Sequence, residues 1–162
     1  MAVKSHKYKN QGFFGIGIMN NVNGLNIGTL WRSAYIMGAS YIFTIDKKYK
    51  KQMSDVTHTW KKIPLYHYKN FDDFYDNQPT ATRIIAVELT EDAIDIADYE
   101  HPDQACYLLG NEQAGLAPKV LKRCHGIVKL PGYFSLNVAV AGSILMYDRV
   151  AKLGGNLPQQ ES

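Results

Sequence analysis

The sequence predicts an α/β fold with a mostly parallel sheet flanked by helices. Short apolar segments typical of buried strands alternate with segments in which apolar residues recur every three or four positions. Glycine, proline and asparagine separate these segments, as turns require. At 162 residues the chain is long enough for one domain with a core, which we expect over residues 1–153. Residues 154–162 lack a core-forming pattern and are predicted to be a disordered tail.

The first half of the chain shows strands and helices in alternation. Residues 12–19 (GFFGIGIM) form an apolar run that ends at two asparagines, which indicates a buried strand. Apolar side chains then follow helical spacing over residues 23–37, and the glycine after them is a common helix stop. Residues 41–45 and 63–68 are again strand-like, and a small helix rich in aromatic residues is expected around residues 71–75.

The second half continues the same alternation. Residues 83–89 (RIIAVEL) and 105–109 are predicted to be buried strands. A proline at position 118 fits the first position of a short helix over residues 118–124. Residues 127–130 are the last predicted strand, and residues 135–153 the last helix, which two glycines stop. Strands that alternate with helices in this way favour a parallel sheet.

Sharp turns with polar residues follow the last two strands. One apolar run ends in residues 110–112 (GNE), so that the carboxylate of Glu112 lies at the carboxyl end of a strand. The next run ends in Pro-Gly at 131–132, after which residues 135–137 (SLN) open the last helix. In open α/β sheets, ligands bind where strand ends and helix N-termini converge. We therefore expect a binding pocket here.

Several other kinds of site are excluded by the motifs. Gly15 and Gly17 suggest a dinucleotide fingerprint, but Asn20 stands where its third glycine is required, and both glycines lie inside the strand. The chain also lacks GxxxxGK[ST], HExxH and GxSxG, which excludes phosphate loops, zincins and α/β-hydrolases. Its histidines and cysteines show no metal-ligand spacing, so we expect no metal.

The location of the protein is predicted from two further observations. Cys106 and Cys124 are isolated in the sequence, and Cys106 falls in an apolar strand, where we expect a buried free thiol. No apolar run is long enough to span a bilayer, and the basic N-terminus lacks the apolar stretch of a secretory signal. A cytoplasmic protein with no membrane contact is the prediction.

Charge is distributed unevenly, although the net charge is only +3. Lysines gather in the N-terminal arm and over residues 46–62, whereas ten of the fifteen acidic residues fall between Asp72 and Asp103. One basic face suits a polyanion such as RNA, and Tyr49 and Trp60 among the lysines could stack on unpaired bases. The alternative is a solvated loop whose aromatic residues pack locally. The lysines that we expect to contact RNA are Lys47, Lys48, Lys50 and Lys51.

The last helix combines an apolar stripe with small residues. The stripe consists of Leu136, Val140, Ile144 and Tyr147. Alanine, glycine and serine at positions 139 and 141–143 permit another backbone to approach closely. This pattern indicates helix packing and suggests a subunit interface.

Three segments carry a specific signal when they are taken together. They are residues 21–34 (NVNGLNIGTLWRSA), 108–116 (LLGNEQAGL) and 128–149 (VKLPGYFSLNVAVAGSILMYDR). Alone, Asn26 would be a helix cap or turn residue and Arg32 part of a surface ion pair. In this order the segments resemble the three motifs of the SpoU (TrmH-like) family of the SPOUT RNA methyltransferases, over nearly the whole chain.

This resemblance implies a SPOUT-type fold whose C-terminal segment forms a deep trefoil knot. It also implies S-adenosylmethionine as methyl donor, a homodimer, and methylation of a ribose 2′-hydroxyl in tRNA or rRNA, with tRNA favoured. The residues that match the catalytic positions of the three motifs are Asn26, Arg32, Glu112, Ser135 and Asn137. Donor contacts, which are largely backbone in this family, map to Val87, Leu89, Leu109, Gly110, Leu130 and Leu136.

The chemistry of methyl transfer agrees with these residues. Displacement at the methyl carbon of a sulfonium needs no metal, but the acceptor hydroxyl must be oriented and its developing charge stabilised. Arg32 is the residue expected beside this hydroxyl. It acts either as the general base often assigned in the family or as a cation that holds a backbone phosphate and positions the ribose.

Three rival functions remain open at this point. A SPOUT enzyme could methylate a base instead of a ribose, although the Ser-Leu-Asn run and the pair of Asn26 and Arg32 favour the ribose. An RNA-binding module with the same fold would bind RNA without transferring a methyl group. A flavodoxin-like nucleotide binder would have no affinity for S-adenosylhomocysteine.

Overall fold

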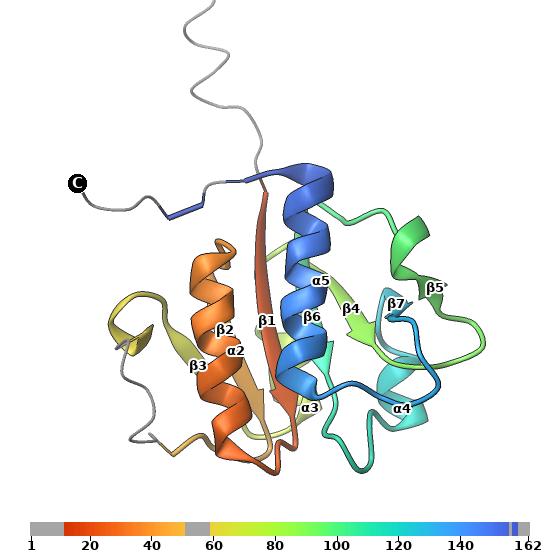
Figure 1. Cartoon of the computed structure of the whole chain (residues 1–162). Coiled ribbons are helices and arrows are strands. Elements are labelled where there is room, and N and C mark those ends of the chain that lie inside the picture. Colours follow the sequence, from red (N-terminus) through yellow and green to blue (C-terminus); the bar gives the residue numbers. More distant parts are fainter. Residues whose placement is uncertain (1–11, 51–58, 156, 159–162) are drawn as a thin grey trace, which may run out of the picture.

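The computed structural model describes residues 12–50, 59–155 and 157–158. Within these residues the chain forms one seven-stranded sheet in the order β3-β2-β1-β6-β4-β7-β5, and every strand pairing is parallel (Figure 1). The strands are β1 (Phe13–Met19), β2 (Tyr41–Ile45), β3 (Leu65–Tyr68), β4 (Arg83–Val87), β5 (Ile94–Asp95), β6 (Gln104–Leu109) and β7 (Gly126–Lys129). The predicted α/β class with a parallel sheet is confirmed.

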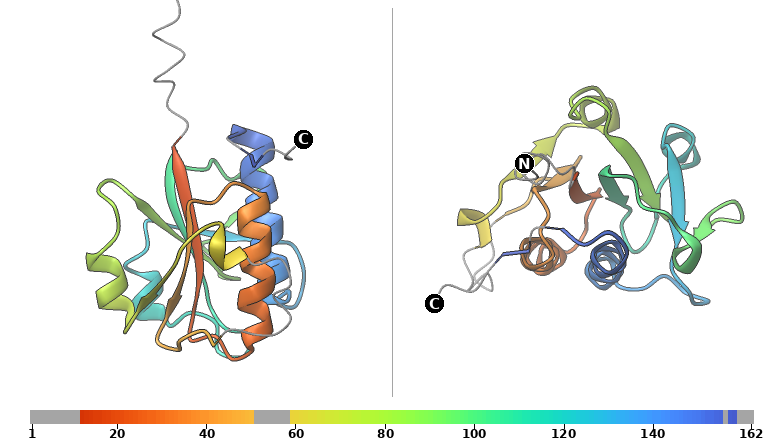
Figure 2. Two further views of the ribbon diagram at one scale, coloured as in Figure 1. Left: turned by 90° about the vertical axis from the view of Figure 1, so that its left-hand side faces the viewer. Right: turned by 90° about the horizontal axis from the view of Figure 1, so that it is seen from above.

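Helices cover both faces of the sheet. Helices α2 (Gly24–Ile36) and α5 (Val138–Leu153) lie side by side on one face, and α3 (Phe71–Asp76) and α4 (Pro118–Leu121) lie on the other (Figure 2). One apolar core fills the space under α2 and α5, and a second lies under α3 and α4. Because the central strands are buried on both sides, they are mostly apolar and show no regular alternation of apolar and polar residues.

The two glycines of β1 make room for aromatic rings of β2. A Cβ atom at Gly15 would lie 2.3 Å from the ring of Tyr41, and one at Gly17 would lie 2.2 Å from the backbone oxygen of Phe43 and 2.4 Å from its ring. Phe43 in turn stacks on Phe74 of α3, with ring centroids 4.6 Å apart. The glycines inside this strand therefore serve close packing in the second core.

The small residues of α5 allow it to approach α2 and the sheet. A Cβ at Gly142 would lie 2.5 Å from Cδ1 of Leu30, so any larger residue there would require the Leu30 side chain to shift. Beside it, the Ser143 hydroxyl donates a hydrogen bond of 2.9 Å to the hydroxyl of Ser33 on α2. The close helix contact expected from these small residues is thus made within the chain. The apolar stripe, by contrast, faces outward: Leu136, Val140, Ile144 and Tyr147 are 39%, 47%, 40% and 63% exposed.

A buried polar cluster fastens the second half of α5 to the loop before β6. His101 hydrogen-bonds through Nδ1 to the Tyr107 hydroxyl and through Nε2 to the Asp148 carboxylate, each at 2.6 Å. Arg149 donates to the backbone oxygens of Pro102 and Asp103 at 2.6 and 2.8 Å. Burial lowers the pKa of His101, although Asp148 opposes this, and burial raises the pKa of Tyr107 to about 12. The cluster lies at the amino end of β6, opposite the turns discussed below.

Some predicted boundaries differ from the structure. Helix α5 begins at Val138 and not at residue 135, because the Asn137 side chain caps the helix by accepting from the backbone N–H groups of Ala139 and Val140. Helix α4 ends at Leu121, before the predicted end at residue 124. The edge strand β5 was not expected, since two residues are too few to show a strand pattern in the sequence. The predicted free, buried thiol of Cys106 is confirmed, and burial raises its pKa to about 12.

We expect the substitution Gly17→Ala to lower the free energy of unfolding by about 2 kcal/mol or more, because the added methyl has no space in a close-packed core. The matched control is Gly28→Ala in α2, where the nearest atom to an added Cβ is the Tyr49 hydroxyl at 3.9 Å. That change should be neutral or stabilise by up to about 1 kcal/mol. Urea denaturation of both variants measures the difference, and equal midpoints would show that the packing argument is wrong.

Candidate functional site

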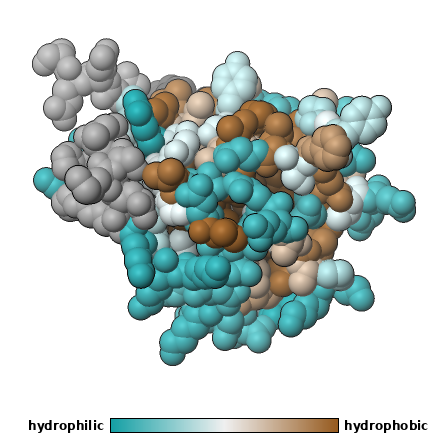
Figure 3. All heavy atoms as spheres, turned by 60° about the horizontal axis from the view of Figure 1, so that its bottom comes forward, coloured by the Kyte–Doolittle hydropathy of each residue, from teal (hydrophilic) through white to brown (hydrophobic). Residues whose placement is uncertain are grey.

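The carboxyl ends of the parallel strands meet at one edge of the sheet, at the bottom of Figure 1. A cavity of about 440 Å³ opens there, between the ends of β4, β6 and β7 and the first turn of α5. Apolar and polar residues are mixed on this end of the molecule, with brown apolar atoms between teal polar ones in Figure 3. A pocket at the strand ends was predicted from the turns in the sequence, and the structure has one.

The walls of the cavity contain the residues predicted to contact a donor. All of them line it: Val87, Leu89, Leu109, Gly110, Leu130 and Leu136. Two of the residues predicted to be catalytic, Glu112 and Ser135, line it as well. The only charged side chains among the lining residues are the carboxylates of Glu88 and Glu112. The cavity is therefore partly apolar and has acidic groups on its walls.

Hydrogen bonds join three of the predicted catalytic residues beside this cavity. Asn26 Nδ2 donates to Glu112 Oε1 at 2.6 Å, and Asn137 Nδ2 donates to Asn26 Oδ1 at 3.1 Å and to Glu112 Oε1 at 3.3 Å. The side-chain oxygen of Asn137 caps α5. Its side-chain nitrogen therefore points toward Asn26 and Glu112. Asn26 is buried, with 6% of its surface exposed. Segments from three separate parts of the chain thus form one polar network.

The loop that carries Glu112 is held by its own backbone and by Asn111. The Asn111 side-chain oxygen accepts from the backbone N–H groups of Gln113 and Ala114, and its amide donates to the backbone oxygen of Asn20 after β1. A Cβ at Gly110 would lie 2.4 Å from the backbone of Gly115, so the two ends of the loop touch. These contacts explain why glycine flanks both ends of the Asn-Glu-Gln-Ala sequence.

Two residues of the cavity were not singled out from the sequence. The Glu88 carboxylate accepts from the backbone N–H groups of Leu89 and Leu116, at 3.0 and 2.9 Å, and so ties the end of β4 to the Glu112 loop. The Thr90 hydroxyl is buried beside the cavity without a hydrogen-bond partner among the described residues. The sequence did offer a signal for both: they are polar residues directly after the apolar run of β4, as Glu112 is after the run of β6.

Arg32 does not join this network. It follows Asn26 by six residues on α2, which places it about 9 Å along the helix axis and about 120° around it. Its side chain is exposed, on the outward face of α2 that also carries Leu25 and Ile36, 52% and 51% exposed. It forms no hydrogen bond or ion pair with any residue that the structure describes. Within one chain, then, Arg32 is not brought to the cavity with Asn26.

The predicted RNA-binding lysines lie in the segment after β2. Lys47, Lys48 and Lys50 are exposed, and Lys51 lies outside the described residues, as do the lysines of the N-terminal arm. Tyr49 packs its ring edge-to-face on Trp31 of α2, with centroids 5.9 Å apart. The alternative that this aromatic residue packs locally therefore holds for Tyr49, and it fixes the lysine segment beside α2.

Metal-binding clusters and membrane-spanning helices are both absent from the described residues. No group of three or more His, Cys, Asp or Glu side chains there is arranged to hold a metal ion, and the predicted absence of a metal stays a prediction. No helix among them combines the length and apolar character that crossing a bilayer requires.

Known proteins resemble this chain in sequence and in fold. Mouse (Mus musculus) tRNA (guanosine(18)-2'-O)-methyltransferase TARBP1 is 25% identical over 134 residues, which are 76% of this chain and 8% of that protein. The AdoMet-bound rRNA methyltransferase of Sinorhizobium meliloti superposes with a TM-score of 0.77 at 24% identity, over 88% of this chain and 57% of that one. A structure solved in a study of the 2-OH methylation of C/U34 on tRNA gives a TM-score of 0.76 at 22% identity. The match covers 90% of this chain and 99% of that one.

The extent of these matches differs. This chain spans less than a tenth of the mouse relative and under two thirds of the S. meliloti structure, but nearly all of the third protein. The profile of the SpoU rRNA Methylase family matches residues 16–147, from the middle of β1 to the third turn of α5, and so includes the cavity and its network. On this match, the chain belongs to the SpoU rRNA methylase family.

Proposed function

We propose that this protein is an S-adenosylmethionine-dependent RNA methyltransferase that methylates a ribose 2′-hydroxyl. The observation that carries the proposal is the network of Asn26, Glu112 and Asn137, because all three family motifs supply one residue each to a single point beside the cavity. Family membership alone gives RNA methylation as the class of reaction. The network adds polar groups suited to hold an acceptor hydroxyl.

The residues of the cavity fit the proposed donor. Ligand pockets commonly have volumes of about 300–1,000 Å³, with apolar walls and a few polar groups. Leu109, Leu130 and Leu136 would sandwich the adenine ring, and the bent backbone at Gly110 would meet its polar edge. Thr90, whose buried hydroxyl has no hydrogen-bond partner among the described residues, lines the same cavity. When bound, this cofactor supplies an electrophilic methyl group on a positively charged sulfur, which the two carboxylates of the cavity favour.

The network would hold the acceptor hydroxyl. Glu112 Oε1 is occupied by two amide nitrogens, whereas its Oε2 has no hydrogen-bond partner among the described residues. This oxygen can accept a hydrogen bond from a ribose hydroxyl and orient it. Ser135, on the cavity wall, is a second group for the same nucleotide. Holding the reacting groups in line contributes more to such a displacement than a strong base does.

We assign Arg32 to the acceptor as a positioning cation, because arginine side chains stay protonated in proteins and a guanidinium binds phosphate through two hydrogen bonds. Its outward position within one chain agrees with action in a homodimer. Helices α2 and α5 expose apolar side chains: Leu25 and Ile36 on α2, and Val140, Ile144 and Tyr147 on α5. Exposed apolar side chains gathered on one face mark interaction sites. A second copy on this face would receive Arg32 of the first next to its own cavity.

A tRNA acceptor is favoured over rRNA. The names of two relatives refer to 2′-O methylation of tRNA, and the protein studied for position 34 of tRNA has nearly the same extent as this chain. The names of the family and of the S. meliloti protein refer to rRNA, so rRNA is the second substrate to be tested. Base methylation stays the rival reaction.

Several finer expectations stay predictions. They are a single domain over residues 1–153 with a disordered tail, the deep trefoil knot, and a cytoplasmic location, which the free thiols of Cys106 and Cys124 favour.

The function is tested by methyl transfer to total tRNA and to rRNA from labelled S-adenosylmethionine, followed by mass spectrometry of the nucleosides. We expect a 2′-O-methylated nucleoside from tRNA. A methylated base would identify the rival enzyme, and RNA binding without any label would identify a module that has lost transfer.

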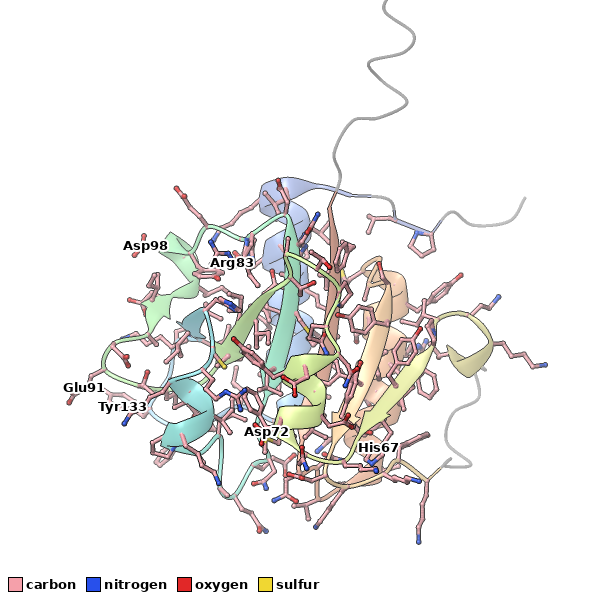
Figure 4. All side chains as sticks on the ribbon, turned by 180° about the vertical axis from the view of Figure 1, so that it is seen from behind. His67, Asp72, Arg83, Glu91, Asp98 and Tyr133 are labelled. Atoms are coloured by element: carbon pink, nitrogen blue, oxygen red, sulfur yellow. The ribbon has the colours of Figure 1, made fainter. Side chains whose placement is uncertain are left out.

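The variant Arg32→Ala should reduce methyl transfer by about 100-fold or more, because loss of a positioning contact misplaces the acceptor hydroxyl. Calorimetric affinity for S-adenosylhomocysteine should stay nearly native, since Arg32 does not line the cavity. The control is Arg83→Ala at the start of β4, an exposed arginine at the opposite edge of the sheet (Figure 4). An Arg32→Ala enzyme with native turnover would remove Arg32 from the reaction.

Mixing two inactive variants tests whether Arg32 acts on the partner's site. Arg32→Ala and Glu112→Ala homodimers are refolded together, so that mixed dimers form. If the site is shared, each mixed dimer has one complete site, and activity should return to about a quarter of the native value because half of randomly paired dimers are mixed. Absence of recovery, with mixed dimers shown by mass spectrometry, would place Arg32 in its own chain's site.

Replacing Lys47, Lys48 and Lys50 with glutamine should weaken RNA binding and reduce the salt dependence of log K. The slope should fall by about 0.7–0.9 for each phosphate that these lysines no longer neutralise. Fluorescence anisotropy with labelled tRNA over a range of salt concentrations measures it, with Arg83→Gln as control. An unchanged slope would exclude this segment from the RNA surface.

A further inference from the structure

The loop between β7 and α5 exposes two adjacent aromatic side chains. All of residues 131–137 are exposed, although the elements on both sides are packed in the core. Tyr133 is 100% exposed and Phe134 87%, more than any other large hydrophobic side chain in the described residues. Aromatic side chains normally bury most of their area and so stabilise a fold. These two contribute almost nothing to the fold of this chain, which points to a role in binding.

The position of the pair connects it to the site. Phe134 lines the cavity together with Ser135 and Leu136, whereas Tyr133 stands outside it, at the periphery of the molecule in Figure 4. Four residues after Tyr133, Asn137 joins the network with Asn26 and Glu112. Both rings are therefore carried by the same short loop that leads into the network.

Unpaired cations border the same cavity on another side. Helix α4 contributes Pro118 and Leu121 to the cavity wall. From the same turn and its cap, Lys119 and Lys122 extend into solvent, and neither side chain forms an ion pair within the described part of the chain. The mouth of the cavity thus combines exposed aromatic rings with free positive charge, the pair of features that binds single-stranded nucleic acid.

We propose that Tyr133 and Phe134 form a stacking surface for the base of the nucleotide to be methylated, and that Lys119 and Lys122 hold its neighbouring phosphates. This inference rests on the proposed RNA methyl transfer and adds how the acceptor base is bound. A nucleotide that leaves the helical stack to bring its ribose hydroxyl to the network loses the stacking partners of its base. The two rings replace them. The substrate is therefore an unpaired nucleotide in a loop, held with little preference for the identity of its base.

The central test uses Tyr133→Ala, because Tyr133 is fully exposed and does not line the cavity, so neither folding nor donor binding depends on it. Tyr133→Phe keeps the ring, and Tyr66→Ala on β3 removes a half-exposed tyrosine far from the cavity as control. The probe is a single-stranded RNA of about ten nucleotides, the length that one site covers, with a central 2-aminopurine whose fluorescence is quenched when it stacks.

With native protein, Tyr133→Phe and Tyr66→Ala we expect the same quenching of the probe. With Tyr133→Ala we expect quenching to be largely lost, and the KM for total tRNA to rise about tenfold, the effect of removing one stacking partner. Affinity for S-adenosylhomocysteine should be native in all variants, as should the sedimentation coefficient.

Two results would overturn the inference. Native quenching by Tyr133→Ala would show that the base does not stack there, and a change in sedimentation would show that a second copy of the chain covers the loop instead. The proposed function is tested separately, by methyl transfer with the native protein. If that transfer is absent, the proposed function fails, and quenching by itself still decides whether the rings bind a base.

Discussion

The shared carboxylate of Glu112 is the contact on which the arrangement of the site depends. One of its oxygens accepts from Asn26, 86 residues earlier, and from Asn137, 25 residues later. Parallel strands bring these segments to one edge of the sheet, but only directed hydrogen bonds fix their side chains relative to one another. If the carboxylate were absent, the buried amide of Asn26 would lose a partner, which costs about 1–3 kcal/mol. Hydrogen bonds to Asn111 and the close contact of two glycines fix the backbone of the loop that carries this carboxylate.

Charge is separated around the site in a way that suits two different ligands. The cavity has carboxylates and no basic group on its walls, whereas the exposed cations, Arg32, the lysines after β2 and those of α4, lie outside it. A cationic donor and a polyanionic acceptor need opposite electrostatic surroundings within a short distance. Acidic groups in the hollow and basic groups on the surface outside it meet both needs.

One pair of helices has two different faces. Toward the sheet, α2 and α5 present small and aliphatic residues that touch closely, with Gly142 against Leu30 and Ser143 on Ser33. Away from it they present large apolar residues and Arg32 to solvent. The same helices can therefore complete the core of one chain and meet a second copy. The first turn of α2 carries Asn26, and Asn137 caps α5, so the packing of the two helices also sets the geometry of the network. The buried His101 cluster holds the far end of α5 and leaves its first turn at the cavity.

The sequence by itself determined the fold class, most strands and helices, and the pocket at the strand ends, because apolar periodicity and turn residues act locally. The ordered motifs also named the residues that line the cavity and form the network. Only the tertiary structure decided which of them meet. Asn26 and Arg32 share one helix, yet helical geometry turns the first toward Glu112 and the second away from the cavity. Likewise Val140 and Ile144 follow the spacing of a core stripe but face solvent, since periodicity marks a face of a helix without saying what covers it. Glu88, Thr90 and the exposed pair Tyr133 and Phe134 gain meaning only from the cavity beside them, because a local pattern carries no information about distant neighbours.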